Sequence, residues 1–264
     1  MKTRILMYGN IVFVFLTIAV NSLANILPIN GKYTGDLSDN VPNLFVPTGL
    51  TFAIWGVIYA LLVCFAVYQI LAMKKKEDID TGFVSKIGVF FMLASIGNIV
   101  WIFLWHYEQV VYSLLPMILL FVSLLMIYIR LEIGLVSVPR KEKLLVHLPI
   151  SVYLGWITVA TIANVTAALV VSNVDGLFLG EVLWTMLVIA VATLITLLII
   201  YTRVDIGYCL VIIWALLGIA IKRMEADLIY GIQPGIATVA ILSMIIILVF
   251  LAAKNVIFGS PSSR

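Results

Sequence analysis

Eight apolar segments, each close to the length that crosses a bilayer, take up most of this chain. The hydrocarbon core of a bilayer requires about 20 consecutive apolar residues in a helix. Hydrophobic residues make up 64% of the 264 residues and charged residues only 11%, and the mean hydropathy is +1.20. A water-soluble domain has no core large enough for so much apolar surface. We therefore predict an all-α integral membrane protein with about eight transmembrane helices, near residues 8–27, 50–73, 84–105, 110–129, 145–171, 181–201, 206–221 and 233–253.

Positive charge is distributed unequally between the two sets of connecting segments. If the N-terminus lies inside, 13 of the 16 Lys and Arg residues fall on the cytoplasmic side, and only Lys32, Lys222 and Arg223 fall on the other. Loops on the cytoplasmic side of membrane proteins carry an excess of Lys and Arg. The pattern predicts a multi-pass protein of the cell membrane with both termini in the cytoplasm.

The first apolar segment has two interpretations. Lys2 and Arg4 precede an apolar run and a Ser-Leu-Ala sequence that ends at Ala24, as in a cleaved secretory signal. The run continues through Leu27, which is long enough to approach a full span and favours retention as the first helix.

The longest predicted outer loop covers residues 28–47, with the sequence PINGKYTGDLSDNVPNLFVP. Gly, Pro, Asn and Asp, which favour turns over helix, dominate it. Such a loop either folds over the mouth of the helix bundle as a lid or is a passive connector.

The sequence offers few groups for catalysis. His106 and His147 are the only histidines, and the predicted topology places them on opposite sides of the membrane, so they cannot share a metal ion. The predicted helix centres contain essentially no ionisable residue, and Glu181 lies only at the edge of a span. No hydrolase triad or phosphate-binding motif is present. We predict that the protein is not an enzyme, requires no cofactor and holds no metal.

Aromatic and amide side chains recur at helical spacing in three of the predicted helices. Positions three, four, seven or eleven apart share one face of a helix. The residues concerned are Trp55 and Tyr59 in the second helix, Asn98, Trp101 and Trp105 in the third, and Tyr153, Trp156, Ala160 and Asn164 in the fifth.

Two interpretations of these faces compete. In the first, the aromatic residues form an interfacial belt, and the two Asn residues hydrogen-bond neighbouring helices to one another. In the second, the three faces turn toward each other and line a pocket for a flat, apolar ligand with a few polar atoms. Periodicity alone does not decide between them.

These motifs resemble the TspO/MBR family, the tryptophan-rich sensory proteins related to the translocator protein (peripheral benzodiazepine receptor). The family's second helix begins with Pro-x-x-x-Phe-x-x-x-Trp-x-x-x-Tyr, to which Pro47, Trp55 and Tyr59 conform, with Phe52 displaced by one residue. Its third helix carries Leu-Asn-x-x-Trp-x-x-x-Phe, and here Asn98 and Trp101 conform while Trp105 replaces the final aromatic residue.

The family's fifth helix carries Pro-Tyr-x-x-Trp-x-x-x-Ala-x-x-x-Asn. The spacing from Tyr153 through Trp156 and Ala160 to Asn164 reproduces it without a gap, although Pro149 is displaced. The similarity covers roughly residues 8 to 172. We predict a TspO-like five-helix transmembrane bundle with its lid loop over residues 1–172, and an extension of three additional transmembrane helices over residues 173–264.

The resemblance implies a binding protein with a pocket beneath the first loop, a possible homodimer, and ligands such as protoporphyrin, haem or a sterol-like molecule. In the family the second-helix Trp and the third-helix Asn contact ligand, and those roles map to Trp55 and Asn98. We expect a sensory or ligand-handling role. The alternatives are a permease or exporter of small hydrophobic molecules, and a membrane enzyme that degrades a bound tetrapyrrole.

Overall fold

The computed structural model describes residues 2–27, 29–32, 37, 41–74, 80–174, 179–225 and 231–258. Within these ranges the structure is helical, apart from turns, loops and one isolated β-bridge between Ile29 and Lys32. The elements are α1 (Lys2–Ile26), η1 (Gly49–Ala53), α3 (Ile54–Met73), α4 (Gly82–Ile87), α5 (Phe90–His106), α6 (Leu114–Arg130), α7 (Arg140–Glu142), η2 (Lys143–His147), α8 (Leu148–Val171), α9 (Glu181–Arg203), α10 (Ile206–Met224) and α11 (Pro234–Phe258). Each predicted transmembrane segment corresponds to one main helix, which confirms the all-α membrane class.

Six helical stretches in the described part of the chain are long and apolar enough to cross a membrane. The other two, α5 and α6, have 17 residues each, about 26 Å at 1.5 Å per residue, slightly less than the hydrocarbon core. The predicted third segment is divided at Gly88, whose φ of 58° ends α4 before α5 begins. A positive φ of this kind favours glycine, so the division follows from the sequence.

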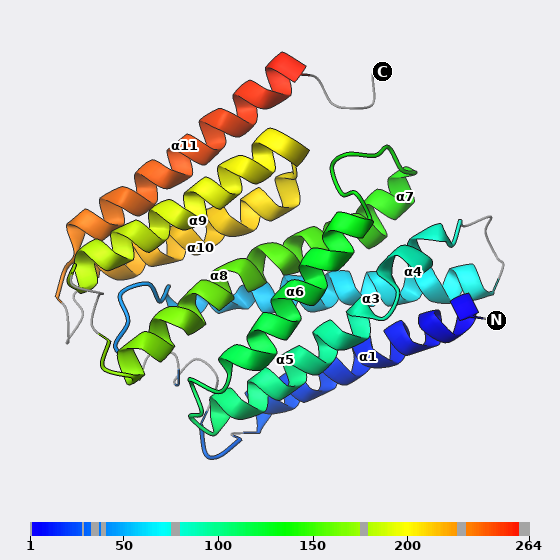
Figure 1. Cartoon of the computed structure of the whole chain (residues 1–264), viewed down its shortest axis with the longest axis horizontal. Helices are drawn as coiled ribbons and strands as arrows, with labels where there is room; N and C mark the ends of the chain where they lie inside the picture. The colour runs from blue at the N-terminus through cyan, green and yellow to red at the C-terminus, as the bar shows by residue number, and fades with distance from the viewer. Residues whose placement is uncertain are drawn as a thin grey trace.

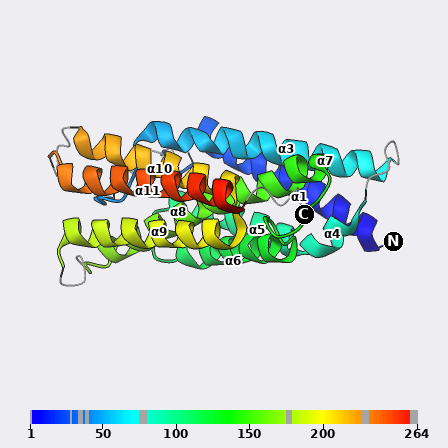
Figure 2. The ribbon, with the colours of Figure 1, turned by 90° about the horizontal axis from the view of Figure 1, so that it is seen from above.

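The helices lie side by side at different tilts, with α5 and α6 inclined steeply to α3, and α8 is central (Figures 1 and 2). It contacts α3, α6, α9 and α10. We call α1 to α8 the N-terminal bundle and α9 to α11 the C-terminal helices, which lie together on one side of α8 (Figure 1). Because α11 packs on α9 and α10, the C-terminal helices meet the bundle mainly through α10, which packs on α8 and η1.

Small residues bring α8 and α10 close together. A Cβ atom added at Gly155 would lie 3.1 Å from the Cβ of Val211, and one at Gly207 would lie 3.3 Å from the Cβ of Ser151. Helices in membranes associate through such small residues because their backbones can then approach closely. The backbones of α8 and α10 are therefore closely packed at Gly155 and Gly207.

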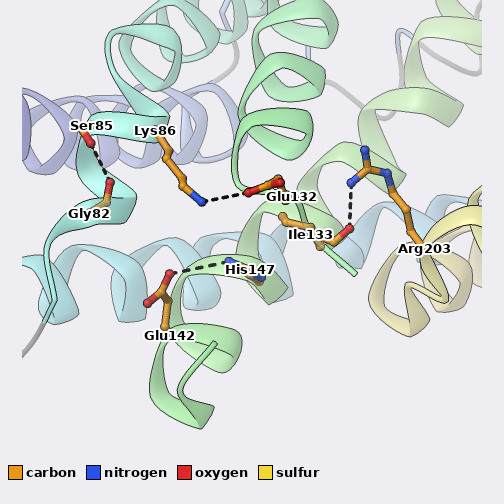
Figure 3. Close-up of polar contacts among 8 residues, drawn as sticks. All are labelled: Gly82, Ser85, Lys86, Glu132, Ile133, Glu142, His147 and Arg203. Atoms are coloured by element: carbon orange, nitrogen blue, oxygen red, sulfur yellow. Dashed lines mark hydrogen bonds and ion pairs between the residues drawn. The ribbon is translucent and has the colours of Figure 1, made fainter. Parts of the chain in front are cut away.

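A second contact joins the two parts where α9 ends beside the loop after α6 (Figure 3). There the Nη1 of Arg203, the last residue of α9, donates to the carbonyl oxygen of Ile133 over 2.9 Å. The neighbouring Gly134 has a φ of 81°, and a Cβ atom there would lie 2.1 Å from the Arg203 carbonyl oxygen. The ion pair from Lys86 to Glu132, 3.2 Å long, links α4 to the same loop. Gly134 thus permits a backbone approach that no larger residue allows.

One face of α1 carries buried polar residues at heptad-like spacing: Asn10, Thr17 and Asn21. The Asn10 side chain donates to Gln69 of α3 over 3.0 Å, and the Asn21 side chain donates to Asn98 of α5 over 2.5 Å. Buried amides in a membrane protein need partners of this kind because lipid supplies none. These bonds join α1 to α3 and α5 of the bundle. Whether the first helix is cleaved or retained stays a prediction.

The pair of Asn21 and Asn98 provides a stability test. We expect Asn98→Leu to lower the free energy of unfolding by about 0.6–1.7 kcal/mol, the range for polar contacts between transmembrane helices, because the bond from Asn21 to α5 is lost. The double variant Asn21→Leu/Asn98→Leu should lose less free energy of unfolding than the two single variants lose in sum. Unfolding in mixed micelles followed by circular dichroism measures this, and strictly additive losses would contradict the pairing.

Candidate ligand-binding site

An apolar cavity of about 60 Å³ lies at the end of the molecule where η1 leads into α3. Four segments form its wall: the loop at residues 41–47, the η1–α3 junction, α5 and α8. Four of the chain's six Trp residues line it. The complete wall consists of Val41, Val46, Pro47, Phe52, Trp55, Trp101, Trp105, Trp156, Val159, Ala160, Ala163, Asn164 and Ala167.

The space in this wall comes from the small side chains of α8. Ala160, Ala163 and Ala167 follow Trp156 on one face of the helix, at spacings of three and four residues. Because alanine side chains end at Cβ, that face is hollow where the Trp residues of α3 and α5 oppose it. The cavity is thus built from one small-residue surface and several large aromatic ones.

Aromatic side chains contact one another across and along the wall. The ring of Trp156 meets Phe52 at 5.8 Å and Trp55 at 6.3 Å between centroids, both nearly perpendicular. Trp101 and Trp105 stack at 5.6 Å with planes 22° apart. Edge-to-face and offset-stacked pairs are the favoured aromatic arrangements. The Trp side chains therefore hold each other in place.

The amide of Asn164 fixes one side of the cavity. Its Oδ1 accepts a hydrogen bond from the indole Nε1 of Trp101 over 2.8 Å and another from the Ser113 hydroxyl over 3.1 Å. Its Nδ2 lies 3.0 Å from the same hydroxyl oxygen. The side chain is buried, so it satisfies its own polar atoms while holding Trp101 against the cavity.

The described end of the predicted lid loop packs over α8. The side chain of Asn43 donates to the Thr166 hydroxyl over 2.7 Å and accepts from the backbone N–H of Phe45 over 3.0 Å. Val46 and Pro47 are buried and line the cavity. Residues 28, 33–36 and 38–40 of the predicted lid lie outside the described residues.

Eight of the eleven predicted site residues lie in this wall: Pro47, Phe52, Trp55, Trp101, Trp105, Trp156, Ala160 and Asn164. The structure thus brings together three helix faces that periodicity singled out, and it favours a cavity at positions where an interfacial belt was the alternative. Contact with a ligand stays a prediction for all of them.

Three predicted residues lie outside the wall. Tyr59 stacks on Trp55 at 5.6 Å, and Tyr153 meets the same ring edge-on at 6.0 Å, so both form a layer behind it. Asn98 turns toward α1 because Asn21 donates to it, and it is fully buried. For Asn98 the structure matches the helix-pairing interpretation of the sequence.

Sequence reasoning missed five wall residues. Val159, Ala163 and Ala167 lie beside Trp156 and Asn164 at helical spacing, so the same periodicity, applied to small residues, would have found them. Val41 and Val46 belong to the loop, where no periodic pattern applies.

The wall of the cavity is uncharged, and the cavity itself is small. Benzene occupies protein cavities of about 150 Å³, and drug-sized ligands occupy pockets of about 300–1,000 Å³. At about 60 Å³ the cavity is narrower than either. A larger ligand therefore requires the wall to widen.

The described residues contain no group of three His, Cys, Asp or Glu side chains that could hold a metal ion. His106 ends α5, with its Nδ1 2.7 Å from the Ile102 carbonyl oxygen. His147 ends η2, with its Nε2 3.8 Å from the Glu142 carboxylate (Figure 3). Neither histidine lies in the cavity wall.

The family of the chain follows from comparison with known families. Residues 5–253 match the family model described as TSPO-like protein. The chain belongs to the TSPO-like protein family. Comparisons with curated proteins and with solved structures found no match.

The extent of this match bears on the C-terminal helices. The region matched to the TSPO-like family includes α9, α10 and most of α11, whereas the motifs recognised in the sequence end near residue 172. The TSPO-like family model thus extends across all the main helices, and the division of the chain into two domains stays a prediction.

The hydrogen bond from Trp101 to Asn164 can be tested with a matched pair of variants. Trp101 and Trp105 have equal exposure, 8%, but only Trp101 donates its indole N–H to a partner within the described part of the chain. We expect Trp101→Phe to lower the free energy of unfolding by about 1 kcal/mol more than Trp105→Phe, the usual net value of a hydrogen bond. If unfolding in detergent shows equal losses of free energy for Trp101→Phe and Trp105→Phe, the hydrogen bond contributes nothing to stability.

Proposed function

We propose that this TSPO-like membrane protein binds an apolar, planar small molecule, with a tetrapyrrole as the leading class, in the cavity between α3, α5 and α8. The observation that carries the proposal is the concentration of four Trp side chains on one cavity. The expected role is sensing or handling of the ligand within the membrane.

Aromatic walls favour flat ligands for a physical reason. A planar conjugated ring buries apolar area on both faces and makes the offset-stacked or edge-to-face contacts that Trp rings prefer. Trp55 and Trp156 meet edge-to-face, Trp101 and Trp105 form a stacked pair, and all four line the cavity. A flat ligand between them could contact both sets at once.

The chemistry of the wall supports binding over catalysis. Its described members are Val, Pro, Phe, Trp, Ala and Asn side chains. None of these residue types supplies a general acid, a general base or an activated nucleophile near neutral pH. The proposal is therefore of a binding protein whose wall offers mainly apolar and aromatic contact, since the polar atoms of Asn164 already bond to Trp101 and Ser113.

Ligand binding must widen the cavity, and the wall contains a segment suited to move. Pro47 and Val46 belong to a loop that is held to α8 by the side-chain bonds of Asn43. The loop also buries Leu44, Phe45 and Val46, but moving one such segment exposes less apolar surface than separating packed helices. We propose that residues 41–46 move away from α8 when the ligand enters, while Pro47 stays against Gly218 of α10. This is the lid function predicted from the sequence.

Titration of the full-length protein in nanodiscs with protoporphyrin IX tests this function. Trp55→Ala should weaken binding about tenfold, equivalent to about 1.4 kcal/mol, because one aromatic face is lost. Ala163→Leu should weaken binding at least as much, because the added side chain fills space in the wall. Quenching of tryptophan fluorescence and the change in porphyrin fluorescence give the affinities.

The matched control is Trp184→Ala. Trp184 lies on α9, outside this wall, so its loss removes one indole from the protein without changing the cavity. Affinity equal to that of the wild type is expected for this variant. Equal affinity in wild type, Trp55→Ala and Ala163→Leu would overturn the assignment of the ligand to this cavity.

A further inference from the structure

The segment at the mouth of the cavity lies between the cavity and α10. Pro47 and Phe52 both line the cavity, and the residues between them turn into η1. On its other side this segment contacts α10. A single short stretch of chain therefore faces the proposed ligand and the C-terminal helices at the same time.

Two hydrogen bonds attach this stretch to α10. The backbone N–H of Thr48 donates to the carbonyl oxygen of Gly218 over 3.2 Å. The indole Nε1 of Trp214 donates to the carbonyl oxygen of Thr51 over 2.9 Å. Trp214 and Gly218 are four residues apart and so lie on one face of α10. The two bonds secure the stretch at its start and within η1.

Steric contact makes the attachment rigid. A Cβ atom at Gly218 would lie 1.9 Å from the Oγ1 of Thr51 and 3.0 Å from the Cβ of Pro47. Thr51 is only 2% exposed, and its Oγ1 lies 3.1 Å from that of Thr48. The neighbours of Gly218 thus have little room to move, and only glycine permits this approach.

Pro47 connects this contact to the cavity directly. It lines the cavity and lies against Gly218, so any displacement of α10 at this point moves part of the wall. An ordinary contact between two helices would not have this effect, because the residues it joins do not line the cavity.

We infer that Gly218 and Trp214 of α10 are positioning residues for the cavity, through which the C-terminal helices set the width of its mouth and the affinity for ligand. This inference rests on the proposed binding function. Because coupling between two sites is reciprocal, a ligand that moves Pro47 or Phe52 must also act on α10. The C-terminal helices are then the part of the protein that responds to binding.

The test uses Gly218→Ala in the full-length protein in nanodiscs, with two measurements. The first is hydrogen–deuterium exchange of the peptide that covers residues 44–53, and the second is the affinity for protoporphyrin IX. We expect exchange in this peptide to rise severalfold and affinity to fall about tenfold. The double variant Gly218→Ala/Thr51→Ala lacks the Thr51 Oγ1, the atom nearest the added Cβ. It should restore part of the protection from exchange and part of the affinity.

Two further variants separate this effect from general damage. Gly56→Ala places the same substitution in α3, where a Cβ atom meets nothing within 4 Å, and should leave both measurements unchanged. Trp214→Phe keeps an aromatic ring but loses the donor to Thr51, and should shift both measurements in the direction of Gly218→Ala by a smaller factor. If Gly218→Ala does not fold, Trp214→Phe decides the question.

The outcomes distinguish this inference from the proposed function. If the wild type does not bind protoporphyrin IX, the tetrapyrrole assignment fails, and the exchange data alone decide whether α10 positions the segment. Raised exchange in Gly218→Ala but not in Gly56→Ala supports the inference in that case. Exchange and affinity equal to the wild type in both Gly218→Ala and Trp214→Phe would overturn it.

Discussion

The buried amide of Asn164 holds together the parts of the chain that form the cavity. Through the indole of Trp101 it joins α8 to α5, and through the Ser113 hydroxyl it joins α8 to the turn before α6. In a lipid environment such bonds persist because no solvent competes for the polar atoms. With Trp101 held in this way, the stacked Trp105 is held too, and the alanine face of α8 stays open opposite them. The side of the wall formed by Trp101 and Trp105 therefore depends on one amide.

The same physical rule explains two further polar contacts of the molecule. Asn21 pairs with Asn98 to fix α1 on α5, and the carbonyl oxygens of Gly218 and Thr51 pair with donors across the contact between η1 and α10. Each bond lies where two helices or segments must keep a defined register. Apolar contacts with lipid-like neighbours are interchangeable and specify register poorly, whereas hydrogen bonds and small-residue contacts specify it well.

Much of the fold could be predicted from the sequence because lipid imposes a simple length and hydropathy requirement on each helix. Helical periodicity also placed Trp101 with Trp105 on one face of the third predicted helix, and Trp156 with Asn164 on one face of the fifth. Periodicity does not say which neighbour a face meets, so Asn98 could not be assigned to α1 from spacing alone. The docking of α10 at the cavity mouth could not be predicted either, because Gly218 becomes informative only when Thr51 lies against it.

The central claim is that the cavity between α3, α5 and α8 holds an apolar, planar ligand. The most direct test is the absorption spectrum of the protein as purified from cells supplied with a tetrapyrrole precursor. This account predicts a Soret-type band that co-purifies with the wild-type protein through a second chromatographic step. A spectrum with protein absorption alone, from cells shown to accumulate tetrapyrrole, would contradict the assignment of a tetrapyrrole to this cavity.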